Sequence, residues 1–246
     1  MDIHKPKPMH NWREFLAEIA VVVLGVLIAL SAEQVVENLH EARSAREARE
    51  ALREELVQDL SDEQIRRNSA QACITRRLDE IGAYLDAVGR GEAVTPPSWI
   101  GRPPIAVAYN GQWLASAQSG RVSLLPKVEA ANYADLYYRT QQLQDEQTEE
   151  QRHWTELRTL QRLPRLTPQM IKEFQVALSG ARYSSWRIQL FMLRMRETAQ
   201  KQEGLKPDPG FVLVGEQPKA VSTCIPINTP GDKALAMIGT SYGDPN

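Results

Sequence analysis

Two cysteines are the residues of this chain whose chemistry is easiest to state. Cys73 lies in a charged, helix-forming stretch and Cys224 in a segment rich in proline and glycine. In an oxidising compartment such a pair forms a disulfide. The bridge would close a loop of about 150 residues and stabilise the fold by roughly 5 kcal/mol in the chain-entropy description. We predict a Cys73–Cys224 disulfide that holds the C-terminal segment to the bulk of the protein, with two unrelated buried thiols as the alternative.

Glu18 is the second residue of chemical interest, because it is the single charge in an otherwise apolar stretch. An ionisable side chain inside a membrane helix is often functional. Glu18 is close enough to the start of the stretch to reach water. We therefore favour an interfacial carboxylate without a function, and an intramembrane polar site is the alternative.

The other polar residues form no recognisable catalytic or metal-binding pattern. The histidines lack the helical His-x-x-x-His or Glu-x-x-His spacing of a metal site. The chain also lacks a Gly-x-Ser-x-Gly elbow, a Ser-x-x-Lys pair and the glycine loops that bind nucleotides. We therefore predict no catalytic residue, no metal and no cofactor. The histidines are His4, His10, His40 and His153.

Paired acids and aromatic residues have simpler interpretations. In Glu54-Glu55 and Glu149-Glu150 the two neighbours diverge on a helix, so we expect solvated faces. Aromatic residues in the central region could line a ligand pocket, but at helical spacing they more often form core. These aromatic residues are Trp99, Trp113, Tyr133, Tyr137 and Tyr138.

Residues 15–36 have the composition of a membrane-spanning helix. The stretch from Phe15 to Ala32 holds one charge, and eighteen helical residues rise about 27 Å, close to the roughly 30 Å of a hydrocarbon core. Trp12 and Arg13 precede it, where an indole and a cation suit the headgroup layer. A cleaved signal peptide is the alternative, but acidic residues are unusual in such signals. We predict an uncleaved single-pass anchor in a lipid bilayer.

The flanking charges predict the orientation of this anchor. Lysines and Arg13 precede the apolar stretch, whereas the charged residues directly after it are acidic as far as Arg43. The positive-inside rule then places residues 1–14 in the cytoplasm and the domain after residue 36 outside. Within the span, Val21, Gly25 and Ala29 form a small-residue face that would permit two such helices to pair.

The region after the anchor has a helical pattern. Residues 33–88 form one long pattern with a polar stretch from Ser61 to Gln71, which predicts a bend or an exposed turn. Glycines end this pattern, and residues 91–104 form a proline-rich loop. A short helix is expected from Gly111 to Ser119, with Gly120 as a left-handed cap.

Two further long helices are expected. One has Pro126 in its first turn and a polar middle, residues 141–152, that we expect to be exposed. The other begins at Thr167-Pro168 and carries an apolar stripe that requires partner helices. The members of that stripe are Met170, Phe174, Leu178, Ala181, Ser185, Ile188, Met192 and Met195.

The predicted fold is therefore mainly α. One N-terminal transmembrane helix continues into an extracytoplasmic bundle of about four helices, residues 37–203. Residues 204–246 are rich in proline and glycine, and we expect an irregular, extended tail packed on the bundle. A content of 42% hydrophobic and 24% charged residues fits a globular domain. A net charge of -2 provides no overall basic field for nucleic acid.

Two stretches of sequence carry a resemblance. The first is Trp12-Arg13 followed by EIAVVVLGVLIALSAEQVVEN at 18–38, and the second is QWLASAQSGRVSLLPKVEAANYADLYYR at 112–139. Together they resemble a widespread set of uncharacterised bacterial single-pass envelope proteins with a Glu-led anchor and a helical domain. The resemblance implies the bacterial inner membrane and a periplasmic domain, and it implies no activity. The matching positions are Glu18, Leu24, Gly25, Val26, Trp113, Ser119, Gly120, Tyr137 and Tyr138.

Three functions are compatible with this architecture. The first is a noncatalytic scaffold or accessory subunit of a membrane complex, with an envelope protein or a second copy of the chain as partner. The second is an extracytoplasmic ligand-binding or sensing module that acts through a partner, and the third is an enzyme with an unrecognised site. We expect the first, because the anchor, the long helix and the missing catalytic patterns favour it over an argument from fold alone.

Overall fold

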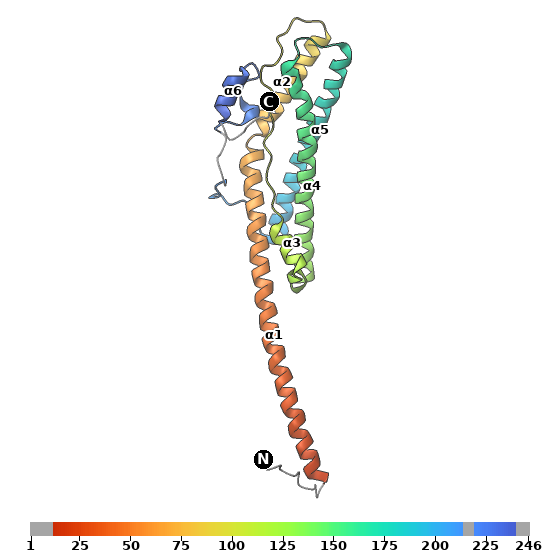
Figure 1. The fold of residues 1–246 in the computed structure, drawn as a ribbon, viewed down its shortest axis with the longest axis vertical. Coiled ribbons are helices and arrows are strands. Elements are labelled where there is room, and N and C mark those ends of the chain that lie inside the picture. Colours follow the sequence, from red (N-terminus) through yellow and green to blue (C-terminus); the bar gives the residue numbers. More distant parts are fainter. Residues whose placement is uncertain (1–11, 214–218, 240–246) are drawn as a thin grey trace, which may run out of the picture.

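The computed structural model describes residues 12–213 and 219–239, whose regular secondary structure is helical and includes no β-strand (Figure 1). Short 3-10 turns lie at Arg121–Leu124, Thr159–Arg162 and Ser222–Cys224, and π-helical turns at Gln64–Asn68 and Ala199–Glu203. A long, apolar N-terminal helix followed by a helical bundle is thus confirmed. The α-helices are α1 (Trp12–Glu63), α2 (Gln71–Gly89), α3 (Gly111–Gln118), α4 (Lys127–Arg158), α5 (Pro168–Thr198) and α6 (Gly231–Ile238).

Helix α1 is 52 residues long, which corresponds to about 78 Å. Its first part projects beyond the bundle along the long axis of the molecule (Figure 1). The apolar window in this part has a mean hydropathy of 2.6, and none of it is buried by the protein. It is long and apolar enough to cross a membrane. The helix passes through Val35 and Val36 without a break, as the sequence predicted.

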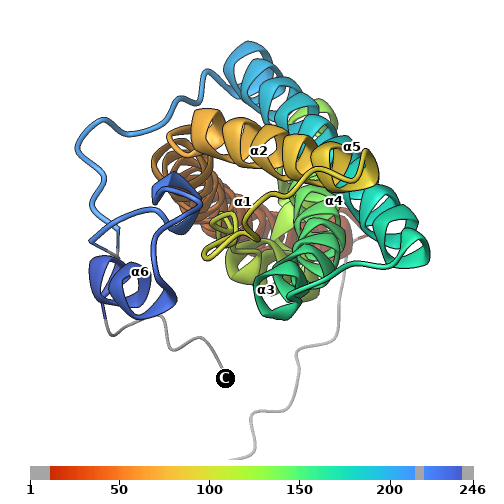
Figure 2. The same ribbon diagram turned by 90° about the horizontal axis from the view of Figure 1, so that it is seen from above.

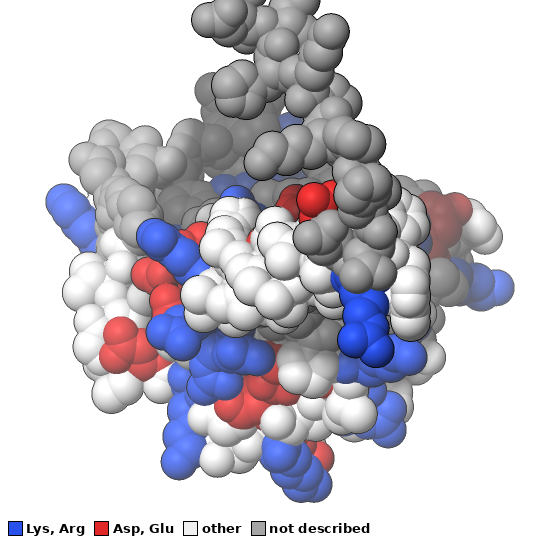
Figure 3. All heavy atoms as spheres, turned by 90° about the horizontal axis from the view of Figure 1, so that it is seen from below, with Lys and Arg blue, Asp and Glu red and all other residues white. Residues whose placement is uncertain are grey.

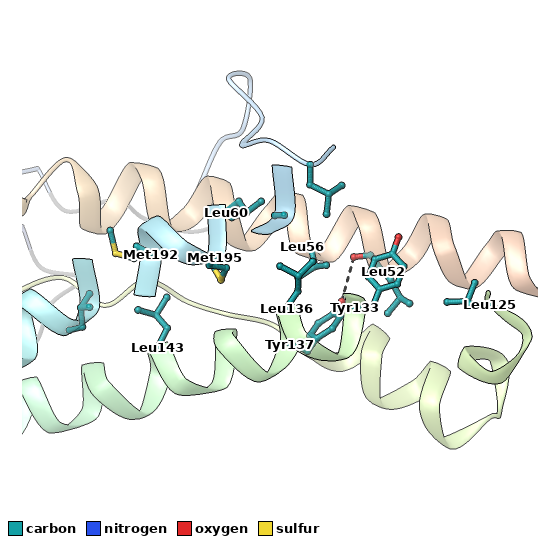
Figure 4. Close-up of a cluster of buried hydrophobic side chains, with 13 residues drawn as sticks. Leu52, Leu56, Leu60, Leu125, Tyr133, Leu136, Tyr137, Leu143, Met192 and Met195 are labelled. Atoms are coloured by element: carbon teal, nitrogen blue, oxygen red, sulfur yellow. Dashed lines mark hydrogen bonds between the residues drawn. The ribbon is translucent and has the colours of Figure 1, made fainter. Parts of the chain in front are cut away.

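The second part of α1 packs into the bundle. Leu52, Leu56 and Leu60 recur every fourth residue, so they share one helix face. Figure 4 shows this face against α4 and α5, where the Tyr137 hydroxyl reaches the Leu52 carbonyl at 3.4 Å. The side chains that meet the three leucines are Leu136, Tyr137 and Leu143 of α4 and Met192 and Met195 of α5.

A second hydrophobic cluster fills the far end of the bundle, where α2, α4 and α5 meet. It includes Ile74, Leu78 and Ile81 of α2 with Trp154 and Leu157 of α4. The apolar stripe predicted for α5 faces these two clusters: it is buried from Phe174 to Met195, and Met170 is half-buried. The predicted start of α5 is confirmed as well, because the Thr167 hydroxyl accepts the Met170 N–H at 3.2 Å.

Helices α4 and α5 approach each other closely at one point. Gly180 of α5 faces the imidazole of His153, and a Cβ at this position would collide with the ring. Any larger residue here would require the imidazole ring to move. His153 is therefore part of the packing between α4 and α5.

Two expectations of solvent exposure were wrong, those for the polar middle of α4 and for the acid pairs. The bend predicted for the stretch from Ser61 to Gln71 is present as the π-helical turn Gln64–Asn68, and the inward-facing residues of this stretch are buried. In the polar middle of α4, Glu146, Gln147 and Glu150 are buried too. One member of each acid pair, Glu55 and Glu150, lies in the interior. Their polar partners come from distant parts of the chain, which local periodicity does not reveal.

The loops and turns around α3 follow the sequence more closely. Helix α2 ends at Gly89, and an irregular segment precedes α3, as expected. Gly120 has a φ of 75°, the left-handed conformation that favours glycine, and it ends the α3 turn. Pro126 precedes α4 as its N-cap instead of lying in its first turn.

The C-terminal segment differs from an extended tail. It contains α6, which Figure 2 shows on the side of the bundle opposite α5. This helix forms because Ala234 and Ile238 can bury themselves against Trp99 and Ile225. Nearer the bundle, the Asp208 N–H donates to the Ser61 hydroxyl at 2.7 Å, which attaches the segment as predicted. Residues 1–11, 214–218 and 240–246 of the predicted terminal segments lie outside the described residues.

Candidate functional site: a polar seam between α1 and α4

Three buried carboxylates line one face of α1. Glu55, Asp59 and Asp62 are spaced by four and three residues, so they share a face of the helix. Each accepts a backbone N–H from the irregular segment that leads into α3 or from the first turn of α3. The bonds run from Gln112 to Glu55 Oε2 at 2.9 Å, from Tyr109 to Asp59 Oδ1 at 2.8 Å and from Val107 to Asp62 Oδ1 at 2.8 Å.

Glutamines of α4 bind the same segment from the other side. Gln147 accepts the Ala106 N–H at 2.7 Å and donates to the Ala106 carbonyl at 3.1 Å. Gln144 and Gln151, one turn away in either direction, donate to the carbonyls of Ala108 at 2.7 Å and Pro103 at 3.0 Å. We call the three carboxylates, the three glutamines and the segment 103–112, which they hold from both sides, the polar seam.

The polar seam provides hydrogen-bond partners for a segment that cannot pair with a β-strand. Pro103 and Pro104 keep the segment extended, and it has no neighbouring strand to pair with. Its inward-facing backbone groups, those of Ala106 above all, therefore need side-chain partners, since an unpaired buried amide costs free energy. The two rows of polar side chains provide these partners, and the groove between α1 and α4 is filled by the chain itself.

An ion pair lies beyond the end of the seam. Arg67, in the π-helical turn, donates to both carboxylate oxygens of Glu150 at 2.6 and 2.7 Å, and both side chains are fully buried. Burial raises the pKa of Glu150, an effect that the Arg67 guanidinium opposes. Breaking a buried pair of this kind strongly destabilises the fold, because removal of one partner leaves the other charge unpaired in the interior.

Asp59 is the seam residue with the most altered acidity. Burial raises its pKa to about 8, the Tyr109 amide acts in the opposite direction, and the charges of Glu55, Asp62 and Glu63 raise it further. No hydrogen-bond partner is described for Asp59 Oδ2. The side chain is thus a neutral carboxylic acid over much of the physiological pH range, and it carries a proton that the chain can release at higher pH.

Glu63 connects the seam region to a cleft. It pairs with Arg196 of α5 at 2.9 Å, and burial, opposed by Arg196, raises its pKa to about 7. Arg196 also donates to Gln64 at 3.0 Å and lines a cleft of about 610 Å³ between α1, the end of α5 and the segment after it. Leu60, Leu205 and Pro207 provide apolar walls of this cleft. Its size is that of a small-molecule pocket.

The disulfide predicted from the sequence is present. Cys73 of α2 and Cys224 are bonded, with their Cα atoms 4.9 Å apart. Close by, the buried Arg77 donates to the carbonyls of Trp99 at 2.6 Å, Ile100 at 2.7 Å and Ile225. Burial lowers the pKa of Arg77. The bridge and this guanidinium together hold the proline-rich loop and the C-terminal segment on α2.

The other residues singled out by the sequence lie apart from the seam. Glu18, Val21, Gly25 and Ala29 are exposed on the projecting part of α1, and thirty helical residues, about 45 Å, separate Gly25 from Glu55. No protein atom would meet a Cβ at Gly25 within 4 Å. The roles of Glu18 and of the small-residue face stay predictions, because both would act inside a membrane.

The aromatic residues are distributed between core and surface. Trp113 stacks on Tyr137 with ring centroids 5.1 Å apart, and Tyr133 is buried beside them. Tyr138 is exposed, whereas Trp99 belongs to the separate cluster under α6. They therefore line no common pocket. Among the described residues there is also no group of three or more His, Cys, Asp or Glu that could hold a metal ion.

The sequence contains two local patterns that belong to the polar seam. The acids at 55, 59 and 62 and the glutamines at 144, 147 and 151 each form a row at helical spacing. Either row alone looks like a solvated face, and only their shared contact with segment 103–112 distinguishes them. The chain matches no protein-family model, no curated protein and no solved structure.

Proposed function

We propose that this chain is a noncatalytic, single-pass protein of the bacterial inner membrane, and that its helical domain lies on the periplasmic side. There it acts as a scaffold or accessory subunit of a membrane complex. The observation that carries the proposal is the apolar window of α1, of which nothing is buried by the rest of the protein. Apolar side chains without a partner in the chain require another apolar environment, and a bilayer provides it.

The continuity of α1 supports a mechanical role for the anchor. The helix runs from Trp12 to Glu63 without interruption, so the span and the bundle share one rod. The polar seam and the Arg67–Glu150 pair then attach this rod to α4. An anchor of this kind holds the bundle at a defined height above the membrane instead of on a flexible linker.

The disulfide supports the periplasmic side. Structural disulfides persist in oxidising compartments and are rare in the cytosol. The cationic residues that precede α1 favour the same orientation through the positive-inside rule. Figure 3, seen from the N-terminal end, shows acidic and basic side chains interspersed on the visible face. Such a face favours a protein partner over a polyanion such as nucleic acid.

Membrane fractionation with topology mapping tests this proposal. The full chain should stay in the membrane after carbonate extraction, and mass spectrometry of the mature N-terminus should find residues before Phe15. Protease added to intact spheroplasts should then degrade the domain that follows the span. A mature chain that begins at Glu33 would show a cleaved signal instead, and protection of the domain in spheroplasts would reverse the orientation.

A second candidate function is an extracytoplasmic ligand-binding or sensing module. The cleft of about 610 Å³ at Arg196 and Gln64 favours it. A small apolar cavity of about 120 Å³ between the proline-rich loop and α6, walled by Trp99, Pro103 and Leu235, favours it as well. Native mass spectrometry of protein purified in mild detergent separates the two candidates. A bound small molecule would support the sensing module, and a stoichiometric protein partner would support the scaffold.

A further inference from the structure

Helix α5 is apolar on two opposite faces. The buried stripe from Phe174 to Met195 fills the core, and a second stripe lies on the outer side of the helix. Its members expose much of their surface: Val176 71%, Tyr183 57%, Trp186 56% and Leu193 54%. Leu190 between them is half-buried. We call these five residues the outer face of α5. One helix needs only one apolar face to join a bundle, so the outer face has no role in the fold described here.

The spacing of the outer face is that of a helix-pairing seam. Val176, Tyr183 and Leu190 are seven residues apart, and Trp186 and Leu193 follow Tyr183 and Leu190 by three. This is a heptad pattern with the 3.5-residue period of helices that pack along each other. Tyr183 and Trp186 also contact each other, with ring centroids 5.9 Å apart. Tyrosine, tryptophan and arginine are the residues that contribute most to binding at protein interfaces.

The charged residues that α5 itself places beside the outer face are arginines. Helix α5 contains no acidic residue between Glu173 and Glu197, and arginines occupy positions that flank the stripe. Arg187 lies over the rings of Tyr183 and Phe191, 5.7 and 5.2 Å from their centroids. It also pairs with Glu146 of α4, and Arg182 pairs with Asp79 of α2. Arg194 is exposed and has no ion pair among the described residues.

These charges determine which kind of partner can bind to the outer face. Two copies of the chain that paired through this face would bring arginine opposite arginine in either relative orientation, which is unfavourable. A helix with an apolar stripe between acidic residues would match both the apolar residues and the charges. The bilayer is an unsuitable occupant, because α5 runs along the long axis of the molecule (Figure 1) and its outer face therefore faces sideways.

We propose that the outer face of α5 binds an amphipathic α-helix of another protein, one whose apolar stripe is flanked by Asp and Glu. This deepens the scaffold function proposed above and rests on it, since it names the docking surface and the chemistry of the partner. Trp186 is the central anchor of the contact, and the arginines orient the incoming helix.

Photocrosslinking in the native membrane tests the proposal. The full chain carries p-benzoylphenylalanine at Trp186, and a matched variant carries it at Tyr138, which is exposed on α4 at 63%. Irradiation of the Trp186 variant should give an adduct with a different protein, and the crosslinked peptide should come from a helix with acidic residues beside an apolar stripe. The Tyr138 variant should give no such adduct.

Charge variants sharpen the test. Arg187→Gln together with Arg194→Gln should lower the yield of the adduct about fivefold, because each lost charge contact contributes a modest free energy. A synthetic amphipathic helix with Leu on one face and Glu on the flanks should compete for the adduct, and the same peptide with Lys flanks should not. Equal competition by both peptides would overturn the charge argument.

The remaining outcomes also decide the question. An adduct between two copies of the chain would make the outer face a self-association surface and refute the proposal. The absence of any adduct from membrane-bound, folded protein would refute it too, and circular dichroism establishes folding for each variant. If the chain is missing from the membrane fraction, the proposed anchor fails, whatever is seen at Trp186.

Discussion

The two parts of α1 place their side chains in opposite ways. Between Phe15 and Ala32 the helix exposes apolar residues along its whole circumference. Between Glu55 and Arg67 the end of α1 and the π-helical turn after it bury three carboxylates of the seam, Glu63 and a guanidinium. In the second part each charge meets a donor or a counter-charge from elsewhere in the chain. In the first part none of the described residues covers the apolar window of the helix.

This difference distinguishes residues that stabilise the fold from residues that contact something outside the protein. Buried polar groups are tolerated where the chain itself provides their partners, so the seam is part of the architecture. Apolar groups without a partner in the chain indicate an external environment. By the same reasoning we assign the outer face of α5 to contact with another molecule, and the Arg67–Glu150 pair to the stability of the fold.

The largest effect is expected from breaking the buried pair. Arg67→Met should lower the free energy of unfolding by about 3–5 kcal/mol, because Glu150 is then a buried carboxylate without its counter-charge. Thermal or chemical unfolding of the full chain in detergent, followed by circular dichroism, measures the loss. The double variant Arg67→Met/Glu150→Leu should recover most of it. A single variant as stable as the wild type would show that the pair is not buried as described.

Removal of the disulfide should lower the free energy of unfolding slightly less. Cys73→Ser should destabilise the protein by about 2–5 kcal/mol, because the bridge closes a long loop, and Cys224→Ser should have the same effect. The segment after Gly204 should become sensitive to protease while the stripe of α5 keeps the bundle folded. Nonreducing electrophoresis provides the control: wild type should migrate faster before reduction. Full thiol labelling of wild type from its own compartment would contradict the bridge.

A charge in the projecting part of α1 should affect membrane insertion and leave the bundle unchanged. Leu24→Arg places a guanidinium near the middle of the span, at an apparent insertion cost of about 2.5–3.5 kcal/mol. The variant should shift from the membrane to the soluble or degraded fraction, and the unfolding temperature of the bundle should stay the same. Leu39→Arg, beyond the predicted span, is the matched control and should remain in the membrane. Equal behaviour of the two variants would argue against the span.

The last prediction concerns the proton on Asp59, whose removal affects the pH dependence of stability. Its native pKa of about 8 lies above its ordinary value of 3.8. The native state therefore holds more protons between these values, and the free energy of unfolding falls as pH rises from 4 to 8. Asp59→Asn keeps an acceptor for the Tyr109 N–H and removes the titration. Relative to the wild type, the variant should therefore gain stability as pH rises from 5 to 9.

Thermal melts between pH 4 and pH 9 measure this effect. The wild type should lose stability toward high pH, and the Asp59→Asn variant should lose less. Asp145→Asn, an exposed carboxylate of α4, is the control and should follow the wild-type profile. Parallel profiles for Asp59→Asn and the wild type would mean that Asp59 is already ionised in the folded protein.

Much of the fold follows from local patterns. The apolar stretch, the Thr167 cap, the glycine that ends α3 and the stripe of α5 depend on neighbours within a few residues, and the sequence therefore predicts each of them. The cysteine pair was predicted from composition and compartment, because two cysteines allow one bridge. The helix α6 was missed, since the burial of Ala234 and Ile238 depends on Trp99, which lies far away in the sequence.

What the sequence by itself determined is the order of elements and the presence of a long apolar helix ahead of a bundle. What only the tertiary structure decided is the environment of the polar residues. Glu55 and Glu54 are the same residue type, side by side, and one is buried while the other is exposed. The cause is the position of segment 103–112, whose amides reach Glu55 and Asp59 from about fifty residues away. Partners that arrive from such distances leave no trace in the periodicity of a single helix, because that periodicity reports only which residues share a face.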